Sequence, residues 1–128
     1  MKILVTGVTG YIGKRLLIQL LEEGHHLVCS VRDKNRFGLK LFKEKLDQIE
    51  VIENDFLDES TLNNIPKDIE CAYYLIHSMS SSDGDFKEKE KISADNFRIA
   101  LEKTNVKQVI FLTGIINEEK LSKHLESR

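Results

Sequence analysis

Three glycines near the amino end constrain the fold of this chain more than any other feature. Gly7, Gly10 and Gly13 directly follow a short apolar run at residues 3–5. That run has no helical period and suits a strand buried on both faces. Behind the glycines, apolar residues recur at helical spacing up to Gly24, which is well placed to end a helix. The apolar face of this helix is expected to comprise Ile12, Leu16, Leu17, Leu20 and Leu21.

A strand, a glycine-rich turn and a helix in this order are typical of a site for a diphosphate. Such a turn brings bare backbone close to the ligand, and the first N–H groups of the helix face its negative charge. We expect Gly7 to allow the tight turn, Gly10 to let the ligand approach, and Gly13 to permit close contact between helix and strand. Glycines also serve ordinary turns, but the elements expected on both sides favour a nucleotide-binding element.

The remaining chain alternates between strand-like and helix-like segments. Further strands are expected at 27–31, 49–52, 71–76 and 109–112, and further helices at 37–46, 59–64 and 86–103. This alternation predicts an α/β fold: a doubly wound parallel sheet of Rossmann type, with strand order 3-2-1-4-5, truncated after the fifth strand and the helix that follows. The charged run at 87–91 is interpreted as a solvated helix face.

The sequence from Thr6 to Gly13, Thr-Gly-Val-Thr-Gly-Tyr-Ile-Gly, resembles the short-chain dehydrogenase/reductase superfamily. The likeness is to its extended and atypical branches, which include sugar-nucleotide epimerases and NmrA-like NAD(P)-binding proteins. It covers the whole chain but only the cofactor-binding part of a family member. Residues 1–128 are therefore expected to form one NAD(P)-binding domain without the C-terminal substrate-binding part. The resemblance also implies that Asn96, on the helix at 86–103, steadies the fourth strand.

Composition sets limits on partners and on location. The chain has 128 residues, 41% of them hydrophobic, and a net charge of -2, as expected of one soluble globular domain without a general attraction to nucleic acid or membranes. No apolar run could span a bilayer and no signal peptide precedes the first strand, so a cytoplasmic location is expected. Cys29 and Cys71 are interpreted as buried thiols. The adjacent His25 and His26 lack a third ligand nearby in sequence, and no metal is expected.

The choice of cofactor depends on the residues that close the second strand. Arg32 lies about 20 residues beyond the glycine turn, where dinucleotide folds contact the adenosine ribose. An arginine at this position accommodates the 2′-phosphate of NADP, whereas an acidic residue accepts from the 2′-hydroxyl of NAD. Asp33 could take that second role, so NADP is the favoured cofactor and NAD the alternative.

The resemblance extends the expected site along the edge of the sheet. It implies that Asp55 bonds the adenine amino group, that Phe56 lines the adenine pocket, and that residues 76–78 pass beneath the ribose and nicotinamide. An ordinary turn or cap remains open for Asp55, and a structural role for His77. The expected cofactor contacts are Thr6, Gly7, Thr9, Gly10, Tyr11, Ile12, Gly13, Arg32, Asp33, Asp55, Phe56, Ile76, His77 and Ser78.

The acid/base pair of the family is altered at the end of the chain. Family enzymes carry Ser or Thr after the fifth strand, then Tyr-x-x-x-Lys on the next helix, whose Tyr transfers a proton. Thr113 matches the first position, but His124 and Arg128 occupy the Tyr and Lys positions. Arginine does not deprotonate, so the usual pair is missing and these three are weak catalytic candidates.

Three functions follow from these patterns. The first is the NADP-binding domain of an atypical oxidoreductase or epimerase. The second is a non-enzymatic sensor or interaction module of NmrA type, and the third an inactive fragment. The fifth strand, at the edge of the predicted sheet, could also pair two copies of the chain into a homo-oligomer.

Overall fold

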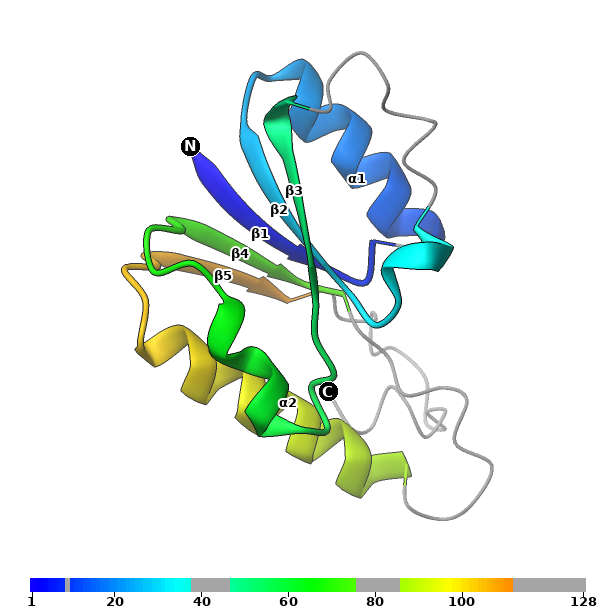
Figure 1. The fold of residues 1–128 in the computed structure, drawn as a ribbon, viewed down its shortest axis with the longest axis vertical. Coiled ribbons are helices and arrows are strands. Elements are labelled where there is room, and N and C mark those ends of the chain that lie inside the picture. Colours follow the sequence, from blue (N-terminus) through cyan, green and yellow to red (C-terminus); the bar gives the residue numbers. More distant parts are fainter. Residues whose placement is uncertain (9, 38–46, 76–85, 112–128) are drawn as a thin grey trace, which may run out of the picture.

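A five-stranded parallel sheet forms the centre of the computed structural model, which describes residues 1–8, 10–37, 47–75 and 86–111. Its strands are β1 (Lys2–Thr6), β2 (His26–Val31), β3 (Ile49–Glu53), β4 (Cys71–Tyr74) and β5 (Gln108–Phe111). Every pair is parallel, and the order is β3-β2-β1-β4-β5 (Figure 1). The fold class and strand order predicted from the sequence are thereby confirmed.

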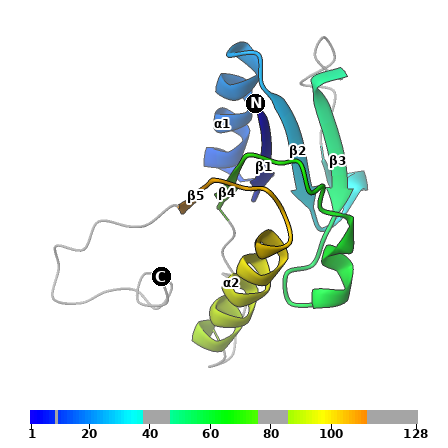
Figure 2. The same ribbon diagram turned by 90° about the vertical axis from the view of Figure 1, so that its left-hand side faces the viewer.

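Two apolar clusters cover the two faces of the sheet. On one face, β1 and β2 pack against α1 (Tyr11–Glu22) through residues such as Val5, Cys29 and Leu17. On the other, α2 (Phe86–Glu102) and the 3₁₀ helix η3 (Glu59–Asn64) pack through residues that include Leu4 and Phe97 (Figure 2). Alternate strand residues supply the two clusters because successive side chains of a strand point to opposite faces.

Helix α1 ends as predicted but presents a narrower apolar face. Gly24 has a φ of +84°, a left-handed conformation that suits glycine, and its N–H donates to the carbonyl of Leu21. Leu17, Leu20 and Leu21 are buried, whereas Ile12 is 48% exposed. The prediction that Ile12 packs on the buried face is wrong, because the buried stripe of α1 runs through Gly13, Leu17, Leu20 and Leu21 and Ile12 lies beside that stripe.

Several predicted segments differ at their ends. By one residue at an end, β2 begins earlier, β3 ends later, α2 ends earlier and β5 is shifted toward the amino end. The 3₁₀ helix η1 (Lys34–Arg36) follows β2, and Phe37 after it is extended and buried in the α1-side cluster. The helix expected at 37–46 therefore does not include Phe37, and its remainder lies outside the described residues. The fourth strand ends at Tyr74 instead of Ile76, and Ile76 also lies outside them.

The prediction that residues 87–91 form a solvated face is wrong for one residue. Glu90 is only 4% exposed. It lies on the same helical stripe as Ser93, Phe97 and Leu101, at spacings of three, seven and eleven residues, and that stripe faces the sheet. Helical phase outweighs charge at this position.

Asn96 has a different partner from the one that the resemblance implied. Its side-chain amide donates to the carbonyl of Phe56 at 2.7 Å, which ties α2 to the segment after β3. The fourth strand is held instead by Ser93, whose hydroxyl lies 2.6 Å from the Tyr74 hydroxyl in a buried contact. The helix is therefore tied to both β4 and the segment that follows β3.

Candidate functional site

The glycine turn lies where β1 and β4 diverge at their carboxyl ends. Gly7 has a φ of +68°, as predicted for the tight turn. A side chain there would lie 2.7 Å from the carbonyl oxygen of Leu75, directly after β4. The turn therefore packs backbone against backbone at the point where the strand order reverses, and this is the position at which open α/β sheets bind ligands.

Gly10 and Gly13 have opposite surroundings within the same turn. A Cβ atom on Gly13 would overlap the carbonyl oxygen of Gly7 and lie 2.8 Å from Cα of Val8, so this glycine lets helix and turn touch. At Gly10, which is exposed, a Cβ atom would meet only the Gly7 oxygen among the described residues, at 3.5 Å. Within that part of the chain, the space beside Gly10 is therefore open to a ligand.

The first turn of α1 directs backbone donors toward that space. The Lys14 N–H donates to the Gly10 carbonyl, which starts the helical ladder, so the N–H groups of residues 11–13 have no carbonyl of their own helix within reach. The first turn contains no acidic side chain. Tyr11 is exposed, and the Arg15 guanidinium carbon lies 4.4 Å from the centre of its ring. The helix end is therefore electropositive.

Thr6 serves the sheet through its side chain. Its buried hydroxyl donates to the carbonyl of Tyr73 at 2.9 Å and accepts from the N–H of Leu75 at 3.1 Å. This clamp joins β1 to β4 beyond their last paired residues, Val5 and Tyr73. Because the hydroxyl proton is already donated to Tyr73, the side chain of Thr6 holds the strands next to the glycine turn.

The loop after β2 carries basic residues and Asp33, and a second carboxylate reaches it from the end of β3. Arg32 is exposed and forms no ion pair with the residues that the structure describes. An Asp33 oxygen accepts from the N–H of Asn35 at 2.9 Å and caps η1. A Glu53 oxygen, from the end of β3, accepts from the N–H of Lys34 at 3.0 Å. Glu53 was not among the residues predicted from the sequence.

A buried amide network beneath this loop was also missed. Asn54 is 3% exposed; its side-chain oxygen accepts from the Ser30 hydroxyl at 2.6 Å. Its amide nitrogen donates to the carbonyl of Thr61 at 2.9 Å and to the side-chain oxygen of Asn64 at 2.7 Å. The network fixes the ends of β2 and β3 to η3. A buried asparagine directly after a strand has no periodic signal, so the sequence pattern did not indicate it.

Asp55 and Phe56 take part in local structure. An Asp55 carboxylate oxygen accepts from the N–H of Leu57 at 3.0 Å, which is the turn interpretation left open above. The ring of Phe56 is buried and packs edge-on against Phe97, with ring centres 5.6 Å apart. This packing leaves little of the ring for adenine, so the expected adenine contacts stay predictions.

Several predicted site residues lie outside the described residues. They are Thr9 of the glycine turn, the segment Ile76, His77 and Ser78 after β4, and the catalytic candidates Thr113, His124 and Arg128. Their roles stay predictions.

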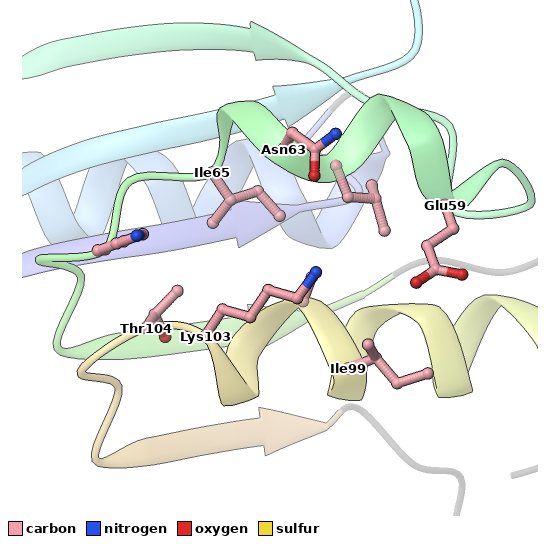
Figure 3. A pocket seen from close by; sticks show the side chains of 9 residues that line it. Glu59, Asn63, Ile65, Ile99, Lys103 and Thr104 are labelled. Atoms are coloured by element: carbon pink, nitrogen blue, oxygen red, sulfur yellow. The ribbon is translucent and has the colours of Figure 1, made fainter.

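A pocket of about 260 Å³ lies elsewhere, between η3 and the C-terminal half of α2. Its lining includes four apolar residues and two charged ones: Leu62, Ile65, Ile99, Ala100, Glu59 and Lys103 (Figure 3). Lys67 and Thr104, also in its lining, precede β4 and β5. The pocket is therefore close to the amino ends of these strands, away from the glycine turn at the carboxyl ends.

The match to a known family agrees with this geometry. The model of the NAD dependent epimerase/dehydratase family matches residues 3–113, from β1 to just beyond β5. The chain belongs to this family. The resemblance to extended short-chain dehydrogenases/reductases is thereby confirmed. The matched residues include most of β1, the glycine turn and α1.

Relatives of the family match this chain over part of their length. The chloroplastic divinyl chlorophyllide a 8-vinyl-reductase of Arabidopsis thaliana is 27% identical over 127 residues, which cover 93% of this chain and 30% of the reductase. Gre2 of Candida albicans, solved with NADPH, superposes with a TM-score of 0.77 at 17% identity, over 88% of this chain and 37% of its own.

Two further solved structures share the fold. The triphenylmethane reductase of Citrobacter sp. in complex with NADP(H) has a TM-score of 0.74 at 18% identity, with 98% of this chain and 42% of that chain covered. A nucleoside-diphosphate-sugar epimerase of Staphylococcus aureus has a TM-score of 0.75 at 18% identity, with the same coverage. This chain thus spans less than half the length of each of these relatives.

The described residues contain neither a membrane-spanning helix nor a cluster of metal ligands. No helix within 1–8, 10–37, 47–75 and 86–111 is long and apolar enough to cross a bilayer. The same part of the chain contains no group of three His, Cys, Asp or Glu side chains that could hold a metal ion.

Proposed function

We propose that this chain binds a nicotinamide dinucleotide, with NADP preferred over NAD, as the cofactor-binding part of a reductase or epimerase. The observation that carries the proposal is the open space at Gly10, beside the N-terminus of α1 and at the switch point between β1 and β4. Backbone donors and a helix dipole at such a point favour a pyrophosphate. The NADPH of Gre2 and the reductase activity named for the Arabidopsis relative support the same function.

Cofactor binding is tested by titration calorimetry with NADP, NADPH, NAD and NADH. Parent protein should bind at least one of them, and Gly10→Val should bind none, because the new side chain would occupy the space that the pyrophosphate needs. The variant should fold, since a Cβ atom at Gly10 meets nothing closer than 3.5 Å in the part of the chain that the structure describes. Melting temperatures without ligand control for folding. Equal affinities in parent and variant would contradict this placement of the diphosphate.

The preference for NADP rests on Arg32. A guanidinium can offer a 2′-phosphate two parallel donors, and a hydrogen bond to a charged group contributes roughly 1.5–3 kcal/mol, or about tenfold to a hundredfold in affinity. Arg32→Ala should weaken NADP by about that factor and leave NAD nearly unchanged. Lys107→Ala, which removes an exposed cation near the start of β5, is the control. If Asp33→Ala is instead the damaging change and NAD binds as well as NADP, the preference is assigned to the wrong residue.

A further inference from the structure

Two carboxylates occupy the backbone donors of the loop that follows β2. The N–H of Lys34 donates to Glu53 and the N–H of Asn35 donates to Asp33, at 3.0 and 2.9 Å. Glu53 comes from a different strand, β3, where its Cα pairs in register with Val31. This pairing places Glu53 beside the residue that directly precedes Arg32. The candidate phosphate-binding arginine and an acidic side chain thus share the same corner of the sheet.

The charge on Glu53 acts against a phosphate in that corner. Glu53 is exposed, and its carboxylate forms no ion pair with a side chain among the described residues. A 2′-phosphate carries close to two negative charges, and the N–H groups of Lys34 and Asn35, which could otherwise donate to it, are occupied by the two carboxylates. A ribose 2′-hydroxyl has no such conflict, because it can donate to a carboxylate.

We infer that Glu53 is a specificity-determining residue of the proposed cofactor site, whose carboxylate disfavours the 2′-phosphate of NADP and limits the preference that Arg32 creates. The inference rests on the proposed dinucleotide site. From the sequence, the choice between NADP and NAD was based on Arg32 and Asp33. The inference adds Glu53, which lies on β3 more than twenty positions beyond the end of β2.

The test compares Glu53→Gln with parent protein by calorimetry, with NADP and NAD as ligands. Glutamine keeps an oxygen that can accept from the Lys34 N–H but removes the charge. We expect NADP to bind about three- to tenfold more tightly and NAD to change by less than about twofold, as for a surface charge contact that salt partly screens. The gain should shrink when ionic strength is raised. Glu50→Gln, an exposed residue three positions earlier on β3, removes the same charge and should change neither affinity.

A second variant separates charge from structure. Glu53→Ala removes both the charge and the acceptor. If Glu53→Gln binds both cofactors like the parent while Glu53→Ala weakens both, Glu53 only holds the loop and the inference is overturned. If Glu50→Gln gives the same gain as Glu53→Gln, the effect is one of net charge and the inference is again overturned. Binding of no dinucleotide by parent protein would refute the proposed function, and the inference with it. Binding with an NADP-to-NAD ratio unmoved by Glu53→Gln would refute the inference alone.

Discussion

At the scale of single residues, the glycines of the turn have different roles, which substitutions can separate. A Cβ atom on Gly13 would overlap the Gly7 carbonyl, whereas the same atom on Gly10 meets only ordinary contact distance. The three glycines of one motif thus divide into two that pack and one that leaves room.

We predict that Gly13→Ala costs about 1–3 kcal/mol of unfolding free energy, since backbone must shift to admit the methyl group. Gly10→Ala, the matched substitution, should stay within about 1 kcal/mol of the parent. Urea unfolding followed by circular dichroism measures both. Equal midpoints for the two variants would show that the turn relaxes around Gly13 without cost.

The thiol of Cys29 gives a pH dependence with a definite sign. Burial raises its pKa from 9.0 to about 12. The folded protein therefore keeps a proton that the unfolded chain releases, so this contribution to stability is complete below about pH 9 and is lost as pH rises toward 12.

We predict that Cys29→Ala flattens the fall of unfolding free energy above pH 9, by about 1.4 kcal/mol per pH unit at most. Denaturant unfolding of parent and variant at several pH values between 8 and 11 measures the difference in slope. Parallel profiles for the two proteins would mean that the buried thiol does not titrate in this way.

At the scale of elements, polar side chains at the strand ends fasten one element to the next. Thr6 joins β1 to β4, and Asn54 joins the ends of β2 and β3 to η3. Asn96, on α2, joins that helix to Phe56 in the segment after β3. These bonds lie at the carboxyl edge, where the candidate site is. These hydrogen bonds fix the positions of the strand ends beside the candidate site.

We predict that Asn54→Ala lowers the unfolding free energy by about 2–3 kcal/mol, because Ser30 and the Thr61 carbonyl lose a partner inside the protein. Asn63→Ala is the control: this side chain is exposed on η3, its amide lies 3.4 Å from the Ser60 carbonyl, and its loss should cost less than about 0.5 kcal/mol. Chemical unfolding of both variants decides. A similar, small loss for each would show that water replaces the network.

The order of strands could be predicted from the sequence because it depends on a few strong local signals. The glycines mark the first strand and helix, and five apolar runs separated by helical patterns permit few other topologies. Glu90 and Asn54 could not be predicted, because pattern arguments assign polar residues to the surface and both are buried by tertiary contacts. Glu53 was missed for a second reason: its partner Lys34 is distant in sequence and becomes a neighbour only through strand register.

At the scale of the whole molecule, β5 forms one edge of the described sheet. β5 pairs only with β4 among the described strands, and its Phe111 is 52% exposed. An edge strand with exposed apolar side chains is a site at which chains associate.

We predict that the protein self-associates at high concentration and that Val109→Lys, on β5, reduces this association. Ile18→Lys, which places the same charge at an exposed aliphatic position on α1, should not. Sedimentation velocity over a range of concentrations tests both. A parent protein that stays monomeric at millimolar concentration would contradict the prediction.

The clamp made by Thr6 also turns one backbone proton into a reporter. The amide of Leu75 bonds to a side chain instead of a strand carbonyl, beside the glycine turn. Its exchange with deuterium oxide should therefore report opening of the junction between β1 and β4. In Thr6→Val, which fills similar space without the hydroxyl, that proton should exchange many times faster than its neighbours in β4. In the parent, a dinucleotide bound at the turn should slow the exchange of the Leu75 amide. The exchange rate of this one proton would then report whether the site is occupied.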